Sequence, residues 1–549
     1  MNRLFLGVNE MPKVMLIMPP EGYPVQVFNL RFNLLSIPVG LLSIASYLKS
    51  KGIEVSIYDS RVDIDIVSLE GVSQDYFGAS PEKIKQKIKM YQPDIIGISS
   101  LYTIYQENAF LVAKIAKEVN KNILTIIGGP NPSFYNLDVL KKCPELDICV
   151  IGEGEYTLYN LIESLQKIWN FKDVPSISYR DKGEIKTNRF TEPIKDLDSL
   201  PLLNYDLLDL EKYFMFQDKG YYSRFDYVYP GSERSISMVT SRGCPYKCIF
   251  CARFQHMGRT WRFHSPEYVA NSIERLVRNY KVNHIFFEDD CINLDPKRFE
   301  EILDIVIRKG IKFTWSTPNG TKADLWSENL IKKCKISQAT YLKLAFESGS
   351  QNVMDRIVNK KLNISKAINY VKTAHKEKID LQAFFMIGFP GETKREIIET
   401  VKFILKLKFK YNVLPSLSIA APFPGTPMWQ IVSDKGYLKP KGKQLKWSKS
   451  PVDSVIETEE FSYKFLVRIS NLVMFLVIAD TIIKSFIFLF IHPVRSLKLI
   501  FYTVIKKTLK NPRNIGQYLF ELIFLKLQYK NCMMMNFNNH SKNGKLSKM

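Results

Sequence analysis

Histidine is scarce in this chain of 549 residues, and it is unevenly distributed. There are six histidines, and none lies before His256. Residues 1–255 therefore contain no imidazole that could ligate a metal ion. None of the predicted strands is followed by a GxGxxG fingerprint, which argues against a dinucleotide-binding domain.

Cysteine is infrequent as well, at eight residues, and three of the eight crowd into one loop. No secretory signal pattern precedes them, so we expect a reducing, cytoplasmic setting without disulfides. Cys143, Cys149 and Cys532 have no ligand-like spacing, and we expect Cys291 and Cys334 to be buried apolar fillers.

Acidic residues are few in the last part of the chain. Residues 461–549 hold 14 Lys plus Arg but 2 Asp plus Glu, within an overall net charge of +22. This surplus fits solvated helix faces, a surface that meets anionic lipid, or nucleic acid. We disfavour nucleic acid because no RNA-binding signature interleaves aromatic residues with the charge.

The apolar segment Phe465–Ile491 lacks an uninterrupted apolar run long enough to span a membrane. A spanning helix needs 18 or more such residues, whereas the longest charge-free run here is Ile469–Ala479. Asp480 and Lys484 stand four residues apart and could pair on a helix. We therefore expect helices that pack against the central domain or rest on a membrane surface.

Three cysteines, Cys244, Cys248 and Cys251, carry the most chemical information. Their CxxxCxxC spacing lets three thiolates from one loop converge on a single metal centre. A structural zinc site takes four ligands, and a cubane iron–sulfur cluster has four irons. Three cysteines on a cubane leave one iron open for a substrate or cofactor. A zinc loop with Asp, His or water as fourth ligand is the alternative.

Residues 13–167 alternate short apolar runs with stretches of helical periodicity. Continuous apolar runs are typical of strands buried on both faces, so we expect a parallel, doubly wound sheet. Ligands of such folds bind at the carboxyl ends of the strands, where glycines let a large flat ligand approach the backbone. These ends read Pro19-Pro20, Asp59, Ser99-Ser100, Gly128-Gly129-Pro130 and Gly152-Glu153-Gly154-Glu155.

A second β/α rhythm begins near Ser235, and its first strand runs directly into the cysteine loop. Six predicted strands with helices between them indicate a partial, open (β/α)6 barrel, whose chemistry lies at the strand carboxyl ends. The predicted strands are 235–240, 284–290, 312–316, 341–346, 381–387 and 414–420. Five basic residues follow the cysteines and could balance cluster charge, meet an anionic substrate or form a solvated helix start. They are Arg253, His256, Arg259, Arg262 and His264.

These motifs together resemble the class B radical S-adenosylmethionine (SAM) enzymes. Phe250 fills the aromatic position of their CxxxCxΦC signature. The ordered pieces Met18-Pro19-Pro20, Pro38-Val-Gly-Leu-Leu, Gly128-Gly129-Pro130 and Gly152-Glu-Gly-Glu155 are similar to the cobalamin-binding domain that precedes the radical core. The resemblance implies a [4Fe–4S] cluster on the three cysteines, SAM on its open iron, and cobalamin. A generic flavodoxin-like regulatory domain is the alternative for the N-terminal part.

The resemblance also implies which barrel residues hold SAM. Glu288 and Asp289 stand where the family usually has Gly-Gly-Glu and would accept hydrogen bonds from the methionine ammonium. Glu347 and Ser348 would reach the ribose and the methionine carboxylate. Gly388 would let adenine approach the backbone, and Phe250 would offer backbone groups to adenine. The full set implied for SAM is Phe250, Glu288, Asp289, Glu347, Ser348 and Gly388.

Cobalamin contacts are implied at the strand ends of the N-terminal domain. Asn131 stands where many relatives carry histidine, and it either contacts the corrin or caps the next turn. A DxHxxG loop is impossible, so bound cobalamin should lack a histidine lower ligand from this domain. The candidate contacts are Pro20, Ser99, Ser100, Gly128, Gly129, Pro130, Asn131, Gly152 and Glu153.

The expected architecture is α/β with a helical tail. We assign residues 1–172 to a cobalamin-binding Rossmann-like domain and 173–231 to a linker. Residues 232–440 form the radical SAM barrel, and 441–549 a basic, apolar, mostly helical region.

The leading functional hypothesis is a cobalamin-dependent radical SAM methyltransferase that acts on an unactivated carbon through a 5′-deoxyadenosyl radical and methylcobalamin. The alternatives are a radical SAM cyclase or oxidoreductase without net methylation, and a non-catalytic iron–sulfur or corrinoid sensor. The expected partners are a small-molecule or lipid-like substrate, an electron donor such as flavodoxin or ferredoxin, and the inner face of the membrane. The sequence names neither the substrate nor a catalytic residue.

Overall fold

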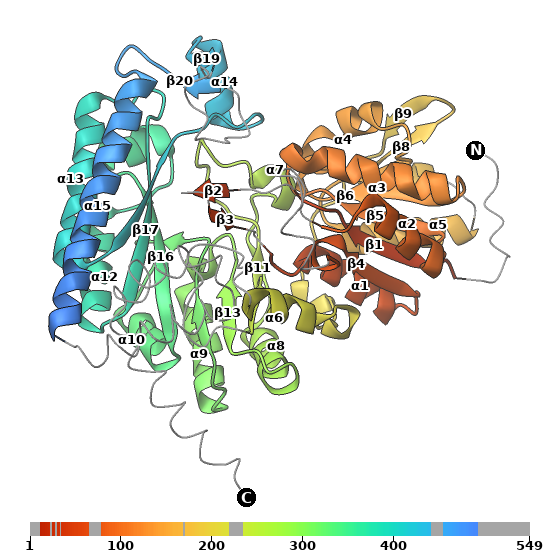
Figure 1. Cartoon of the computed structure of the whole chain (residues 1–549), viewed down its shortest axis with the longest axis horizontal. Coiled ribbons are helices and arrows are strands. Elements are labelled where there is room, and N and C mark those ends of the chain that lie inside the picture. Colours follow the sequence, from red (N-terminus) through yellow and green to blue (C-terminus); the bar gives the residue numbers. More distant parts are fainter. Residues whose placement is uncertain are drawn as a thin grey trace, which may run out of the picture.

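Two α/β units lie side by side in the computed structural model, and a long helix runs along the outer side of the second unit (Figure 1). The structure describes residues 11–491, except for 22–24, 28–29, 33–34, 65–77, 168–170, 219–233 and 441–453. The apolar stretch Leu499–Leu527 and Cys532 therefore lie outside the described residues.

The first unit is built on a sheet of order β4-β1-β5-β6-β7-β8-β9. Its five leading strands are parallel and buried, and helices cover both faces, as a doubly wound sheet requires. These strands are β1 (Val14–Met18), β4 (Val55–Asp59), β5 (Ile95–Ser99), β6 (Leu124–Gly128) and β7 (Ile148–Val150). The helices are α1 (Val39–Ser50), α2 (Pro81–Tyr91), α3 (Gln106–Val119), α4 (Pro130–Lys142) and α5 (Gly154–Lys167).

Strand β1 shows how sequence alternation builds two cores. Val14, Leu16 and Met18 join the apolar cluster under α1 and α5, whereas Met15 and Ile17 join the cluster under α2, α3 and α4. Successive side chains of a strand point to opposite faces, so one unbroken apolar run fills both layers.

Two antiparallel strands extend this sheet into the segment that we had assigned to a linker. β8 (Ile177–Asp181) pairs with β7, and β9 (Glu184–Thr187) pairs with β8. The hairpin turns at Lys182 and Gly183, which both have positive φ. A two-residue loop of this kind matches the right-handed twist of its strands. The N-terminal sheet is therefore mixed rather than wholly parallel, and it reaches past residue 172.

The second unit has the predicted open barrel. Its sheet order is β10-β13-β14-β16-β17-β18, all parallel, with short β15 beside β16. The strands are β10 (Ser235–Met238), β13 (His284–Phe287), β14 (Thr314–Ser316), β15 (Thr321–Lys322), β16 (Ala339–Glu347), β17 (Asp380–Ile387) and β18 (Leu414–Ile419). The helices are α8 (Pro266–Asn279), α9 (Pro296–Arg308), α10 (Glu328–Ile336), α12 (Ile364–Lys376) and α13 (Lys394–Tyr411). All six predicted strands are present.

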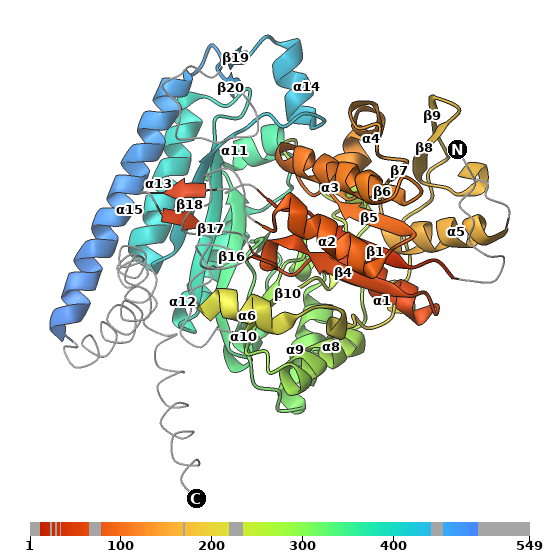
Figure 2. The ribbon, with the colours of Figure 1, turned by 45° about the vertical axis from the view of Figure 1, so that its right-hand side comes forward.

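Shorter elements complete the described part of the chain. A two-stranded ribbon, β11 (Ser241–Arg242) with β12 (Arg262–Phe263), encloses the cysteine loop. The remaining elements are β2 (Val25–Val27), β3 (Leu30–Phe32), α6 (Leu210–Asp218), α7 (Phe254–Met257), α11 (Gln351–Val353), α14 (Pro427–Asp434), β19 (Leu438–Pro440) and β20 (Ser454–Ile456). The barrel core also takes in Leu42 and Val62 from the first unit, so the two units share apolar packing. Figure 2 shows the two units next to each other from a second direction.

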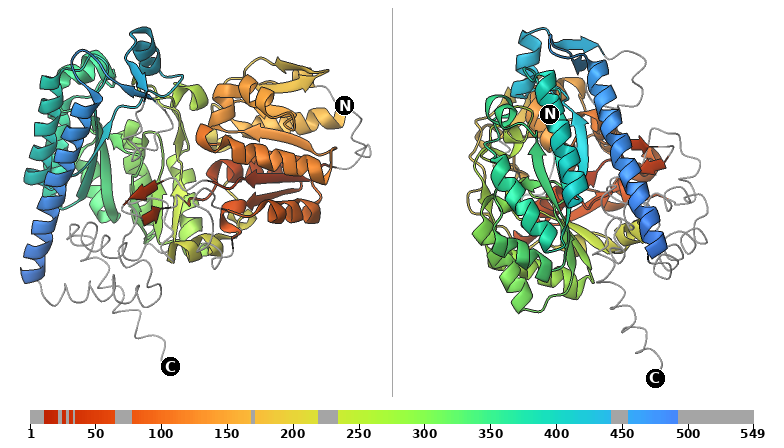
Figure 3. Two further views of the ribbon diagram at one scale, coloured as in Figure 1. Left: turned by 45° about the horizontal axis from the view of Figure 1, so that its top comes forward. Right: turned by 90° about the vertical axis from the view of Figure 1, so that its left-hand side faces the viewer.

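The apolar C-terminal segment forms one helix, α15 (Tyr463–Ile491), that packs lengthwise on α13 and β18 (Figure 3). Leu466 and Val473 are buried in this contact. Asp480 pairs with Lys484 at 2.9 Å, as predicted, and with the buried Lys408 of α13 at 3.2 Å. Residues 463–484 are long and apolar enough to cross a membrane, which by itself is weak support for a span.

Candidate functional site

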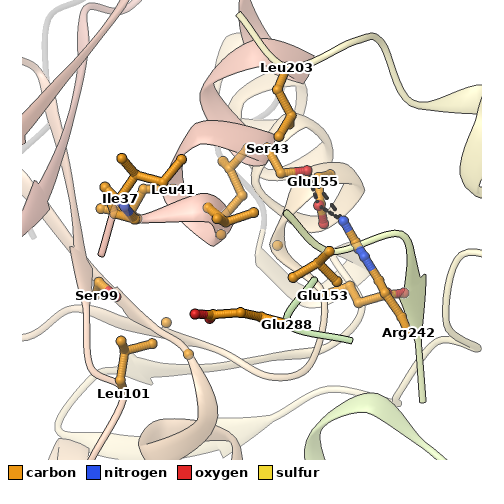
Figure 4. Close-up of a pocket in the computed structure, with 18 of the residues that line it drawn as sticks. Ile37, Leu41, Ser43, Ser99, Leu101, Glu153, Glu155, Leu203, Arg242 and Glu288 are labelled. Carbon is orange, nitrogen blue, oxygen red and sulfur yellow. Dashed lines mark hydrogen bonds and ion pairs between the residues drawn. The ribbon is translucent and has the colours of Figure 1, made fainter. Parts of the chain in front are cut away.

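One cavity of about 710 Å³ lies where the two units meet (Figure 4). It is lined by residues at the carboxyl ends of β1, β5, β6 and β7 and, from the barrel, of β10 and β13. Both units therefore direct the strand edge that binds ligands in such folds toward the same space.

The wall supplied by the first unit combines apolar side chains with glycines and prolines at the strand ends. Gly129 has φ +117°, and a Cβ there would lie 2.7 Å from the carbonyl oxygen of Ser100. Only glycine fits this position without strain. Gly152 also has positive φ, and a Cβ there would meet no atom within 4 Å. The predicted contacts that line the cavity are Ser99, Gly128, Gly129, Pro130, Gly152 and Glu153.

Three predicted cobalamin contacts do not line the cavity. Asn131 is buried and donates to Ser100 at 3.0 Å, while Thr103 donates to its side-chain oxygen at 2.9 Å. Ser100 and Asn131 therefore join the loops after β5 and β6. Pro20 is also buried, and its carbonyl accepts a hydrogen bond from Asn108. These three residues support the edge of the sheet rather than forming its surface.

The cysteine loop emerges from β10 at the barrel end of the cavity. Gly243 has φ +82°, and a Cβ there would come within 2.3 Å of the Thr260 carbonyl oxygen. This glycine lets the chain turn sharply between the ribbon strand β11 and Cys244. Cys244, Cys248 and Cys251 are half-buried and free of disulfides.

The three thiols are close enough to influence one another. Burial raises the pKa of Cys248 to about 12, and the neighbouring Cys251 and Cys244 add to the rise. The pKa values of Cys244 and Cys251 are also raised, mainly by burial. Bound metal would therefore have to supply the positive charge that keeps these thiols ionised.

The number of thiols in the loop bears on the kind of metal centre that it can hold. Structural zinc takes four protein ligands, whereas a cubane has four irons that each need one ligand. Cys244, Cys248 and Cys251 supply three free, half-buried thiols from one loop. They therefore fit a cubane that keeps one iron open.

The three carboxylates that follow β13 have different surroundings. Glu288 faces the cavity (Figure 4) and accepts a hydrogen bond from Ser237 at 3.0 Å. Asp290 forms an ion pair with Arg253. Asp289 is buried and accepts hydrogen bonds from the chain that enters the cysteine loop, from the Thr240 amide and hydroxyl and the Ser241 hydroxyl.

These partners change the interpretation of Asp289. Its carboxylate is occupied by donors from Thr240 and Ser241, and burial raises its pKa against their effect. Asp289 therefore holds the entrance of the cysteine loop, and it does not line the cavity. Glu288 and Asp290 both line the cavity, but Asp290 is paired with Arg253, so Glu288 is the carboxylate of the three without an arginine partner at the cavity.

The other predicted SAM contacts lie farther along the barrel edge, and several already have partners. Glu347 has φ +71° and pairs with the buried Lys360 at 2.7 Å. The Ser348 hydroxyl lies 2.9 Å from that of Thr400. The Phe250 ring is half-buried and lies 6.0 Å from the Phe389 ring.

Gly388 lies in close contact with the C-terminal helix α15. A Cβ at this position would lie 2.5 Å from Leu466 of α15. The missing side chain therefore makes room for the C-terminal helix, which sequence reasoning did not foresee. The Gly388 amide donates to Glu392 at 2.7 Å.

Sequence reasoning missed the ion pairs that join the two units. Arg242 donates to Glu153 and Glu155 at 2.8 and 2.7 Å (Figure 4), and Arg262 donates to Glu153 at 2.9 Å. Arg242 directly precedes Gly243 and Cys244, and this position was the available signal. Glu153 was predicted to bind cofactor, but the two arginines occupy its carboxylate.

Two histidines of the barrel reach the cavity. His264 contacts Asp198 at 3.0 Å and stacks on Tyr268. Nδ1 of His256 has no hydrogen-bond partner among the described residues. Burial lowers the pKa of His256 to about 4. Both imidazoles belong to the barrel, since the first unit contains no histidine.

Comparison with known families agrees with this two-part site. The profile of the radical SAM superfamily matches residues 238–404, and the profile of the B12 binding domain matches residues 26–162. Each profile falls on one of the two units, and the cysteine loop lies within the first match.

Curated relatives with similar sequences span most of the chain. An uncharacterized methyltransferase of Pyrococcus horikoshii, PH0819, is 29% identical over 82% of this chain and 89% of its own. The cytidylyl-2-hydroxyethylphosphonate methyltransferase of Streptomyces wedmorensis is 27% identical over 74% and 79%. The anaerobic magnesium-protoporphyrin IX monomethyl ester cyclase of Rubrivivax gelatinosus is 26% identical over 72% and 66%.

Solved structures show the same fold. The cobalamin-dependent SAM radical enzyme OxsB, with aqua-cobalamin and SAM bound, has a TM-score of 0.65 at 20% identity and covers 93% of this chain and 70% of its own. The radical SAM methyltransferase TsrM of Kitasatospora setae, with cobalamin and a [4Fe–4S] cluster bound, has a TM-score of 0.64 at 14% identity, covering 80% and 84%.

The fold and the site define a cobalamin-dependent radical SAM enzyme, with SAM, a [4Fe–4S] cluster and cobalamin as its cofactors. Residues 238–404 match the radical SAM superfamily and residues 26–162 match the B12 binding domain, so a B12-binding domain precedes the radical SAM core.

Proposed function

We propose that this enzyme transfers a methyl group to an unactivated carbon of its substrate. The observation that carries the proposal is the shared cavity, which the strand ends of the B12-binding unit line together with residues beside the cysteine loop. When bound, SAM at the cluster supplies a 5′-deoxyadenosyl radical and cobalamin supplies a methyl group. The chain's own residues hold the two cofactors around one space from which solvent water can be displaced.

Individual residues have distinct tasks in this proposal. Cys244, Cys248 and Cys251 would hold the cluster, and Glu288 would accept hydrogen bonds from the methionine ammonium. The chain near Gly129 and Gly152 would lie against the corrin. Asp289 keeps the cysteine loop attached to the barrel edge.

Anaerobic reconstitution with iron, sulfide and cobalamin tests the proposal. A methyltransferase should release both 5′-deoxyadenosine and S-adenosylhomocysteine in the presence of substrate. A cyclase or oxidoreductase, the second candidate because a cyclase is among the relatives, should release 5′-deoxyadenosine alone. Absence of both products, with all cofactors bound, would point to a sensor and contradict the proposal.

The lower face of the corrin provides a second test. We propose that cobalamin binds without a histidine ligand from the first unit, because residues 1–255 contain none. Electron paramagnetic resonance of bound Co(II) should then show no nitrogen splitting from a histidine lower ligand. Splitting that disappears in His256→Ala would instead assign the ligand to the barrel.

We also propose that the enzyme works in the cytoplasm against the inner face of the membrane. Large apolar side chains of α15 face outward, including Phe475 at 66% and Phe490 at 83% exposure. The sequence beyond the helix, residues 492–549, contains 11 Lys plus Arg and one acidic residue. An apolar helix face followed by cationic chain suits an anionic bilayer surface. It also makes a lipid-like small molecule an attractive substrate.

Vesicle flotation of the full-length protein tests this membrane proposal. Binding should require phosphatidylglycerol in the vesicles, weaken with salt, and fall in the variant Phe475→Ser with Phe490→Ser. The exposed Met90→Ser, on α2, is the control and should change nothing. Equal recovery of wild type and double variant would contradict the role of the helix face. Resistance to carbonate extraction would show a span instead.

The electron that starts SAM cleavage must come from outside the chain. We propose a flavodoxin or ferredoxin as donor. Reduction of the cluster by a reduced flavodoxin at micromolar concentration, followed by its visible bleaching, would support this partner. A cluster that dithionite reduces but neither protein reduces would contradict it.

A further inference from the structure

Two arginines of the barrel and two glutamates of the B12-binding unit form a closed, buried ion cluster. We call Arg242, Arg262, Glu153 and Glu155 the interdomain clamp. Their side chains are between 4% and 14% exposed. With two positive and two negative charges the clamp is neutral, as burial of ionised groups requires.

The geometry depends on the forked guanidinium of Arg242. One terminal nitrogen donates to Glu153 at 2.8 Å and the other to Glu155 at 2.7 Å. A planar fork can span two carboxylates at once, whereas the single ammonium of lysine is a point charge. Arg242 therefore bridges both glutamates from one fixed position.

The barrel side of the clamp is stiffened by the ribbon. Arg242 and Arg262 are paired residues of β11 and β12. Arg262 also donates to the Ile194 carbonyl at 2.7 Å, and the Ile194 amide donates to Glu153 at 2.7 Å. The two arginines, side by side on the ribbon, both pair with Glu153, and Arg242 also pairs with Glu155.

The other side of the clamp is anchored in the B12-binding unit. Ser43 of α1 donates to Glu155 at 2.6 Å. Arg242, with help from Ser43, holds the pKa of Glu155 below its usual value although burial acts in the opposite direction. Glu153 and Glu155 flank Gly154 where β7 passes into α5, and all three residues line the shared cavity.

The clamp lies between the two predicted cofactor positions. Arg242 stands two residues before Cys244, and Glu153 follows directly after Gly152, whose φ is +77°. Asp289 accepts from Ser241, the neighbour of Arg242, and so ties this point to the end of β13. A continuous set of bonds thus joins the cysteine loop to the strand edge that faces the corrin.

We propose that the interdomain clamp positions the cysteine loop at a set distance from the cobalamin-binding edge. This inference rests on the proposed function. Its residues are positioning residues: they act through the cysteine loop and the β7–α5 turn, and not by touching the reacting atoms. Loss of the fork should leave both cofactors bound while the separation between them becomes heterogeneous.

Pulsed electron paramagnetic resonance on the anaerobic holoenzyme tests the clamp, with bound Co(II) and the reduced cluster as the two spins. Arg242→Lys keeps the charge but removes the fork, and Glu155→Gln keeps the shape but removes a charge. Both should retain wild-type iron and cobalamin content and show a broadened cobalt–cluster distance distribution. Lys117→Met is the matched control, because it breaks a partly buried ion pair with Asp147 inside the first unit. It should keep the wild-type distribution.

Hydrogen exchange of the full-length protein supplies a readout that needs no cofactor. Arg242→Lys should speed exchange in both 241–251 and 152–158, whereas Lys117→Met should leave these segments unchanged. If the wild type binds no cobalamin, the proposed function fails. The hydrogen-exchange comparison between Arg242→Lys and Lys117→Met would still show whether the clamp links the two segments. The inference would be overturned if both clamp variants kept a narrow cobalt–cluster distance distribution and unchanged hydrogen exchange. Faster exchange in 241–251 without faster exchange in 152–158 would also overturn it.

Discussion

The two strand edges that enclose the cavity are built from different chemistry. The B12-binding unit presents mainly apolar side chains together with strand-end glycines and prolines, and Asn131 turns away to join neighbouring loops. The barrel edge presents more charged side chains, most of which already have partners, as Asp289 and Glu347 do. An apolar edge with glycines suits a broad flat ligand, and a charged edge suits a small ionic one.

The difference teaches that a strand-end position alone does not define a contact. Glu288 and Asp289 are adjacent in sequence at the end of the same strand. One faces the cavity and the other supports the cysteine loop. Substitutions that distinguish loss of ligand binding from loss of support for the cysteine loop therefore test the comparison most directly.

Removal of the cluster ligands should have the largest effect. We expect the variant with Cys244, Cys248 and Cys251 changed to Ala to lose its iron and its cleavage of SAM to below detection, because the barrel edge would then lack its metal. Iron analysis, the visible spectrum and 5′-deoxyadenosine assay check this. Cobalamin binding should persist, since it belongs to the other edge. Retained SAM cleavage would refute the ligand assignment.

Gly129→Val should disturb the strand edge of the B12-binding unit and leave the barrel edge unchanged. The new side chain would collide with the Ser100 backbone at a φ of +117°, and such strain costs about 1–3 kcal/mol. Because 1.4 kcal/mol is tenfold in affinity, cobalamin should bind about ten- to a hundredfold more weakly, as equilibrium dialysis would show.

Gly52→Val is the matched control for this substitution. Gly52 has φ +78° with no atom within 4 Å of an added Cβ, and it does not line the cavity. It should cost stability but not cobalamin affinity. Equal loss of affinity in both variants would mean that the effect is general destabilisation.

Glu288→Gln should weaken SAM binding with little change in folding. A hydrogen bond between charged groups contributes about 1.5–3 kcal/mol, so we expect roughly tenfold weaker binding or more by calorimetry on the reconstituted protein. Asp289→Asn should instead lower thermal stability and cluster content, because it loosens Thr240 and Ser241. The reverse pattern would exchange the roles of these two residues.

Asp380 predicts a pH dependence of stability that originates at the opposite end of the barrel. It begins β17, its Oδ2 has no hydrogen-bond partner among the described residues, and burial raises its pKa to about 8. Because the folded state holds this proton more tightly than the unfolded state, the free energy of unfolding should fall as pH rises from about 4 to 8. The slope from one group is at most about 1.4 kcal/mol per pH unit.

Asp380→Asn isolates this contribution. Denaturant unfolding at pH 5 and pH 8 should show a smaller loss of stability in the variant than in wild type. Parallel curves for the two proteins would show that Asp380 is ionised in the folded state.

Much of the fold was predictable because its signals are local. Unbroken apolar runs marked the buried parallel strands, and all six barrel strands lie where periodicity placed them. The hairpin β8–β9 was missed because strands of mixed polarity at a sheet edge resemble linker. Its Lys182-Gly183 turn was the readable clue.

The candidate site was predictable only in part, since partners far apart in sequence decide what each side chain does. The cysteine spacing and the strand-end glycines are local patterns. That Arg242 meets Glu155, or that Gly388 gives way to Leu466, depends on packing between distant segments. No pattern around these residues alone encodes such a meeting.

The contact between Gly388 and Leu466 gives α15 a structural role in the barrel, in addition to the proposed membrane contact. The helix that offers apolar rings to its surroundings also forms the back wall of the loop after β17. A lipid surface or a truncation that displaced α15 would open a gap behind that loop. Helix α15 is therefore part of the packing of the barrel. Truncation of the chain before Leu466 would destabilise the barrel itself.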